Sequence, residues 1–237
     1  MIAIIQEYWQ AYLWSDGANF SGLAITLWLL VLSIAIGFVL SVPLAVARVS
    51  KNRFIRLPVW FYTYVFRGTP LYIQLLIIYT GVYSLSVVRE HAFLDMFFRE
   101  GFNCTVLAFA LNTCAYTTEV FAGAIRSVPY GEVEAARAFG MSRFNLYRRI
   151  ILPSALRRAL PYYSNEVIMM LHSTSVAFTA TVPDILKVAR DVNSATYASF
   201  EAFFIAALLY AVIALSLVWL FRRGETRWLA FLKPQAA

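Results

Sequence analysis

Three ionisable residues stand almost alone within long apolar stretches of this 237-residue chain. Arg67, Glu119 and Glu166 are each the single Asp, Glu, Lys or Arg residue in a stretch of at least 25 residues. In such surroundings a charged group either pairs with an opposite charge or meets a charged solute. A carboxylate accepts from an ammonium or guanidinium group, and a guanidinium donates to a carboxylate. These three residues are therefore candidates for binding a charged solute.

The chain offers little other chemistry. It has two histidines, His91 and His172, and two cysteines, Cys104 and Cys114. The cysteines lie ~15 Å apart if they share one helix, too far to form a disulfide. The Ser and His patterns of hydrolases and metalloproteases are absent, and no Gly-Lys pair forms a P-loop. The sequence therefore predicts no catalytic residue and no metal site. The absence of these patterns disfavours an enzyme that acts within the membrane. His172 is expected to be a packed histidine.

The composition places the chain in a membrane. Hydrophobic residues make up 61% of it and charged residues 14%, against roughly 45–50% and 25% in soluble domains. A soluble protein of this size exposes too many residues to hide so much apolar surface. Disorder is excluded because ample apolar surface is available for burial. The net charge of +7 is then typical of basic loops beside a membrane.

Long stretches with few charges predict an all-α protein with five transmembrane helices, and the alternating pattern of a membrane barrel is absent. The predicted spans cover residues 22–47, 57–88, 101–125, 159–183 and 202–221. Residues 1–21 are expected to form an interfacial helix, 22–221 the transmembrane domain, and 222–237 a cytoplasmic tail. Gly68, Thr69 and Pro70 suit a kink in the second span.

The basic residues predict the orientation. Of the 20 Lys and Arg residues, 15 lie in the first loop, the third loop and the tail. Because cytoplasmic loops collect Lys and Arg, the N-terminus is expected outside the cell, and the third loop, 126–158, in the cytoplasm. At ~1.5 Å per residue, Arg67, Glu119 and Glu166 then lie ~10–16 Å from the cytoplasmic surface, in one layer.

The third loop is too regular to be a simple connector. Apolar residues recur at gaps of three to five, and Val133, Ala136 and Phe139 are expected to form a docking face. Gly140 suits a helix end and Ser142 the N-cap of a second helix. Pro153 is expected to break the chain before the fourth span. The alternative, an amphipathic segment lying on the membrane, fits less well because acids mix with bases and Gly140 interrupts the stripe.

At this point the sequence resembles a known family. Glu134-Ala135-Ala136, Gly140, Ile150 and Leu152-Pro153 match the EAA loop of binding-protein-dependent ABC importer permeases in residue type and spacing. The segment from Arg67 to Leu75 and the segment from Asn165 to Ser175 are similar to the polar amino-acid subfamily. The resemblance covers essentially the whole chain. Among the members of this family, the chain is similar to permeases for histidine, lysine, arginine and ornithine. One departure is His172, where many amino-acid permeases have Lys.

The resemblance implies a non-catalytic subunit of an ATP-driven importer in the bacterial inner membrane. It implies a homologous permease partner, two copies of an ATPase that binds ATP and Mg, and a soluble periplasmic amino-acid-binding protein; no cofactor binds this chain and no nucleic acid is a partner. The expected ATPase-coupling residues are Glu134, Ala135, Ala136, Phe139 and Gly140.

Two interpretations of the charged layer stay open. In one, Arg67 pairs with Glu119 or Glu166 and only holds the helices together. In the other, the layer lines the passage and a carboxylate meets a cationic substrate. The residues predicted to line the passage are Glu166, Asn165, Glu119, Tyr116, Arg67, Thr69, Met169, Ser173 and Thr174. The alternative functions are a permease of an importer for another small polar solute and a passive channel.

Overall fold

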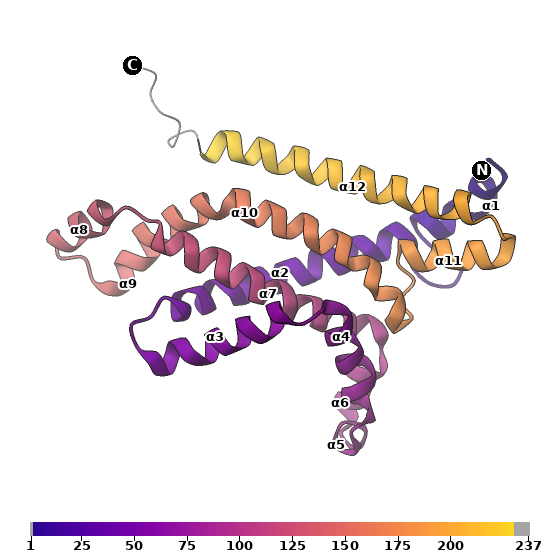
Figure 1. The fold of residues 1–237 in the computed structure, drawn as a ribbon, viewed down its shortest axis with the longest axis horizontal. Helices are drawn as coiled ribbons and strands as arrows, with labels where there is room; N and C mark the ends of the chain where they lie inside the picture. Colours follow the sequence, from indigo (N-terminus) through magenta and orange to yellow (C-terminus); the bar gives the residue numbers. More distant parts are fainter. Residues whose placement is uncertain (1, 230–237) are drawn as a thin grey trace.

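The structure is a computed structural model that describes residues 2–229, and all its regular elements are helices (Figure 1). In chain order they are α1 (Ile2–Leu13), α2 (Gly22–Arg48), α3 (Arg53–Gly68), α4 (Leu71–Leu76), the π-helix η1 (Ile77–Val82), α5 (Ser86–Glu90), α6 (Ala92–Arg99), α7 (Gly101–Arg126), α8 (Tyr130–Ala138), α9 (Arg143–Leu146), the π-helix η2 (Tyr147–Ile151), α10 (Leu152–Ser173), the 3₁₀-helix η3 (Thr174–Ala180), α11 (Ile185–Thr196) and α12 (Ser199–Trp228). The all-α prediction is confirmed for this part of the chain.

Two helices, α2 and α12, are long and apolar enough to cross a membrane, and a bent pair made of α3 and Leu71–Val82 forms a third candidate. The helices α7 and α10 have 26 and 22 residues, which is long enough, but they carry more polar side chains. Many of those on α7 are buried, among them Asn112, Thr117 and Thr118. A helix enclosed by its neighbours needs less apolar surface than one facing lipid.

The second predicted span, 57–88, is interrupted at Gly68, Thr69 and Pro70, where the sequence predicted a kink. Its two helical parts are bent by 105° at the break between Gly68 and Leu71, so that α4, α5 and α6 project to one side of the long helices (Figure 1). Pro70 precedes α4 with a φ of −62°, which proline fixes. The Gln74 amide donates to the carbonyl oxygens of Phe66 and Thr69 at 2.8 and 3.0 Å. The exposed backbone acceptors of the break therefore have partners.

The helix α7 is at the centre of the core and packs against α2, α3 and α10. It approaches α2 closely because Gly37 has no side chain: a Cβ there would clash with the Thr113 side chain. Apolar clusters form at both ends of α7. One surrounds Phe109 and Leu171 near α11, and the other surrounds Phe121 and Leu146 near α8 and α9.

The N-terminal helix α1 packs on the helices at the α11 end of the molecule. Tyr12 is buried, and its hydroxyl donates to the Ala202 carbonyl oxygen of α12 at 3.0 Å. Trp9 and Trp14 stay at least half exposed. Exposed indole rings beside apolar helices are typical of a membrane interface, in keeping with the predicted interfacial helix for 1–21, although the helical part ends at Leu13.

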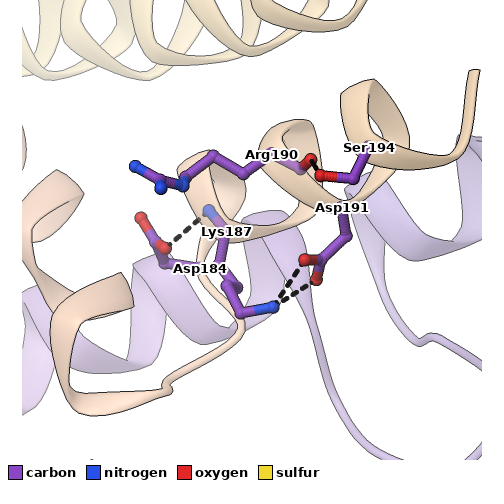
Figure 2. A network of polar contacts seen from close by, with 5 residues as sticks. All are labelled: Asp184, Lys187, Arg190, Asp191 and Ser194. Atoms are coloured by element: carbon purple, nitrogen blue, oxygen red, sulfur yellow. Dashed lines mark hydrogen bonds and ion pairs between the residues drawn. The ribbon is translucent and has the colours of Figure 1, made fainter. Parts of the chain in front are cut away.

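A short helix, α11, follows the 3₁₀ turn that ends the α10 segment. Asp184 caps its N-terminus, accepting from the backbone N–H groups of Leu186 and Lys187 at 3.2 and 2.9 Å. Lys187 pairs with Asp191 one turn later, and the Ser194 hydroxyl donates to the Arg190 carbonyl oxygen (Figure 2). The Tyr210 hydroxyl of α12 also donates to the Asp184 carboxylate at 3.2 Å. The bond from Tyr210 joins the N-terminus of α11 to α12, and the other bonds lie within the α11 segment.

Candidate solute passage and coupling element

A polar pocket of about 490 Å³ lies where the end of α3 faces α7 and α10. Seven of the nine residues predicted for the passage line it. The lining consists of Arg67, Gly68, Thr69, Pro70, Leu71, Asn112, Thr113, Tyr116, Asn165, Glu166, Met169, Met170 and Ser173. The pocket therefore joins one cationic and one anionic side chain of the predicted layer, Arg67 and Glu166, in one cavity.

The helix break places Arg67 at this pocket. Arg67 precedes the break directly, and its guanidinium lies over the Tyr116 ring, 5.3 Å from the ring centroid. The Tyr116 hydroxyl donates to the Arg67 carbonyl oxygen at 3.3 Å. The Asn112 amide donates to the Phe66 carbonyl oxygen and to the Gln74 side chain. Thus α7 fixes both the backbone and the side chain of Arg67, whose guanidinium edges stay available to a carboxylate.

The opposite wall of the pocket comes from one face of α10. Glu166 is half-buried there, between the exposed Asn165 and Met169. Ser173 lies one turn beyond Met169, and its hydroxyl donates back to the Met169 carbonyl oxygen at 2.9 Å. No ion pair within residues 2–229 includes Arg67 or Glu166. The pocket therefore holds a carboxylate and a guanidinium, each without an ion-pair partner, which suits a solute that carries both charges.

Glu119 lies elsewhere. Its carboxylate accepts from the Arg48 guanidinium at 2.6 Å and from the Thr63 hydroxyl at 2.7 Å. Both side chains of the ion pair are mostly buried, with 16% and 17% exposed, and Glu119 does not line the pocket. The structure therefore places Glu119 outside the pocket, and its ion-pair partner is Arg48 and not Arg67. The reason is that α2 ends beside α7 and supplies Arg48, which α3 supports through Thr63.

Thr174 is also turned away from the pocket. It is buried, its hydroxyl donates to the Leu171 carbonyl oxygen at 2.7 Å, and the Tyr210 hydroxyl of α12 is 3.4 Å away. Successive residues of a helix differ in direction by about 100°, so that Ser173 and Thr174 face different neighbours. The prediction that Thr174 lines the passage is not supported by this placement.

Asn112 and Thr113 were missed as lining residues. They precede Tyr116 by four and three positions, and residues at these spacings share a face of a helix. Their spacing from Tyr116 was the sequence signal that could have identified them as lining residues. His172 was expected to be packed, but it is exposed in this chain. The two cysteines are free and buried, and no cluster of metal-binding side chains occurs within residues 2–229.

The third loop forms the predicted pair of short helices. The first, α8, ends before Gly140, whose φ of +72° is the left-handed conformation that glycine adopts at helix ends. Ser142 caps α9, accepting from the Asn145 backbone N–H at 3.4 Å. No break occurs at Pro153, contrary to expectation, since α9 continues through the π-helix η2 into α10. The wider π turn before a proline accommodates its missing N–H and its ring.

The expected coupling residues divide into two sets. Ala136 is buried against the cluster around Leu146 and Ile151, so it holds α8 to the chain's own helices instead of facing a partner. Glu134, Ala135, Phe139 and Gly140 are exposed, Phe139 to 90%.

Glu132 ties α8 to the base of α10. Its carboxylate lies 3.6 Å from the Arg158 guanidinium and accepts from the Ser154 hydroxyl at 3.3 Å. Because α10 also supplies Asn165, Glu166 and Met169 to the pocket, one continuous helical segment joins the exposed face of α8 to the pocket wall.

Comparison with known proteins places the chain in a family. The family described as binding-protein-dependent transport system inner membrane component matches residues 33–229. The histidine/lysine/arginine/ornithine transport system permease protein HisM of Escherichia coli K12 is 64% identical over 236 residues, covering 100% of this chain and 99% of that protein. HisM of Salmonella typhimurium LT2 is 67% identical over 229 residues, covering 97% of each. The crystal structure of an amino acid ABC transporter with histidines is 33% identical, with a TM-score of 0.74, and the match covers 86% of this chain and 91% of that one. The chain therefore belongs to the binding-protein-dependent inner-membrane permeases of ABC transporters.

Proposed function

We propose that this permease forms half of the translocation pathway of an ATP-driven importer for polar, basic amino acids. The observation that carries the proposal is the pocket in which Arg67 and Glu166 lie on facing walls. An amino acid with a basic side chain offers an α-carboxylate to the guanidinium and a cation to the carboxylate. The two HisM relatives are named for the transport of histidine, lysine, arginine and ornithine.

The proposed membrane arrangement has five spans, with the N-terminus outside and the third loop and tail in the cytoplasm of a bacterium. The basic bias of the loops supports this orientation. The spans correspond to α2, to α3 with the bent α4–η1 segment, to α7, to α10 with η3, and to α12. Part of the proposed tail, 230–237, lies outside the described residues.

As a permease of this family the chain is non-catalytic, and ATP hydrolysis belongs to a separate subunit. In the proposal, two copies of an ABC ATPase bind ATP and Mg and contact the exposed face of α8. Phe139 inserts into a groove of the ATPase, and Glu134 pairs with one of its basic residues. Movement of α8 reaches the pocket through Glu132 and α10.

The proposal includes three further partners in the assembled importer. A homologous permease completes the passage, because Asn165 and Met169 in the pocket wall stay exposed in this chain alone. A soluble periplasmic binding protein delivers the amino acid, and the bilayer surrounds the assembly.

An importer for another small polar solute is the second candidate, and the small, polar pocket is compatible with it. A passive channel is less well supported, because a channel has no use for an exposed, capped helix pair anchored to the wall of its passage.

One reconstitution experiment separates these functions. The assembled importer is placed in proteoliposomes with ATP inside and binding protein outside, and uptake of labelled lysine, arginine and histidine is measured. ATP-dependent uptake of all three, with less uptake of neutral amino acids, is expected. Equal uptake with and without ATP would identify a channel, and uptake of other solutes only would favour the second candidate.

A further inference from the structure

A second, larger groove of about 1030 Å³ lies between α10 and the C-terminal part of α12, away from the polar pocket. The C-terminal half of α12, yellow in Figure 1, runs along this side of the molecule. The lining includes residues from α2, α7, α10 and α12. Its volume is at the upper end of the roughly 300–1,000 Å³ of ordinary ligand sites.

Aromatic rings form the wall of this groove. Phe38, Phe121 and Tyr163 pack together with ring centroids 5.4–5.6 Å apart, and Phe221 of α12 lies 6.5 Å from Tyr163. Three of these rings come from α2, α7 and α10, so they form a continuous apolar surface across the three helices. A surface of this kind stays favourable inside a membrane only against protein or the acyl chains of a lipid.

Two arginines stand at one end of the same groove. Arg157 of α10 and Arg227 of α12 both line it and are both exposed. No acidic residue lines the groove, and no ion pair within residues 2–229 includes either arginine. Glu225, two residues before Arg227 in α12, has its carboxylate at α10, where it accepts from the Ser164 hydroxyl at 3.2 Å. The end of the groove therefore has an excess of positive charge.

We propose that this groove is a binding site for one anionic phospholipid. An acyl chain covers the aromatic wall, and the headgroup phosphate accepts from the guanidinium groups of Arg157 and Arg227, a contact for which arginine is well suited. Trp228, beside Arg227 and 57% exposed, lies at headgroup level, where indole rings gather. A helix of a partner permease would cover the aromatic wall but leave both arginines without an anion, which is why charge complementarity favours the lipid.

The test compares two double variants of the assembled importer. In Arg157→Gln/Arg227→Gln both groove arginines lose their charge. In the matched control, Arg222→Gln/Arg223→Gln, the same charge is removed from exposed residues of α12 that do not line the groove. Native mass spectrometry measures how phosphatidylglycerol and phosphatidylcholine compete for the detergent-solubilised complex, and thermal unfolding is recorded with each lipid.

The wild-type complex is expected to retain phosphatidylglycerol in preference to phosphatidylcholine and to melt at higher temperature with it. Each cation near the headgroup strengthens binding of an anionic lipid roughly fivefold. Loss of both groove arginines should therefore reduce the preference for phosphatidylglycerol over phosphatidylcholine about thirtyfold. It should also remove the difference in melting temperature between the complexes with the two lipids. The control should keep both effects. A wild-type complex without lipid preference overturns the proposal. Equal losses in the two double variants overturn it as well, because they show a general effect of charge.

Discussion

The substitution Glu166→Gln tests whether the passage recognises positive charge. Glutamine has nearly the same size and keeps one acceptor oxygen, so the pocket keeps its shape while the negative charge is lost. Glu166 has no ion-pair partner within the described residues, so its removal leaves no buried cation unpaired. The assembled importer should therefore form at the wild-type level.

The size of the effect follows from the contact that is lost. A hydrogen bond to a charged group contributes roughly 1.5–3 kcal/mol, which corresponds to about one to two orders of magnitude in binding. Glu166 is half-buried, and water in an open passage weakens the contact, so a loss of about tenfold is expected. The loss should fall on cationic substrates only, because a neutral side chain gains little from the carboxylate.

Arginine and citrulline make a matched pair of substrates, since they have similar shapes and differ in the charge of the side chain. Uptake of both is measured in proteoliposomes with ATP, for the wild type and for Glu166→Gln. Glu201→Gln is the control, because it makes the same chemical change at the start of α12, outside the pocket. Selective loss of arginine uptake is expected in Glu166→Gln alone. Equal loss of both substrates, or no loss of either, would refute the role of Glu166 in charge recognition.

Three further predictions concern coupling, topology and stability. The Cβ added in Gly140→Ala meets no neighbour within 4 Å, but the residue must adopt a φ of +72°, a conformation that costs an alanine roughly 1–2 kcal/mol. The stimulated ATPase activity of the importer should therefore fall. The control Gly131→Ala is equally open and has no positive φ, so its activity should match the wild type. Wild-type activity in Gly140→Ala would contradict a coupling role for this turn. A cysteine replacing Ser142 should react with thiol reagents from the cytoplasm only, and one replacing Ala92 from outside only; the reverse labelling would overturn the proposed orientation. Glu119→Gln breaks a mostly buried ion pair, at roughly 3–5 kcal/mol, and should lower the melting temperature of the complex; an unchanged melting temperature would remove Glu119 from the structural residues.

Much of the lining of the pocket was predictable because the sequence marks it with rare residues. Arg67 and Glu166 stand out against apolar surroundings, and the helical period then adds Tyr116, Met169 and Ser173. The bend of 105° was not predictable in size. Gly68, Thr69 and Pro70 indicate that the helix is interrupted. Its direction afterwards depends on the bonds to the freed carbonyl groups, which come from Gln74 just after the break and from Asn112 in a distant segment.

Glu119 shows why depth along the chain does not identify a site. Counting residues placed it in the same layer as Arg67 and Glu166, and depth says nothing of the direction around the helix axis. Its partner Arg48 comes from a distant segment, and the two meet because Gly37 allows α2 to approach α7 closely. A single sequence does not show which helices are neighbours, so the ion pair and the passage residue were indistinguishable before the structure.

The coupling loop shows the same limit within a single motif. The apolar spacing predicted one docking face made of Val133, Ala136 and Phe139, but the structure divides these residues. Val133 and Ala136 pack against the chain's own helices, and Phe139 is exposed. The helix α8 must be held by its own chain before it can transmit force, because a helix of nine residues is not stable alone. Ala136 serves this purpose by packing against Leu146, and Glu132 adds the contact with α10. The exposed side with Glu134 and Phe139 is the one proposed to contact the ATPase. Substitutions of Ala136 should therefore act through the stability of the loop, and substitutions of Phe139 through that proposed contact.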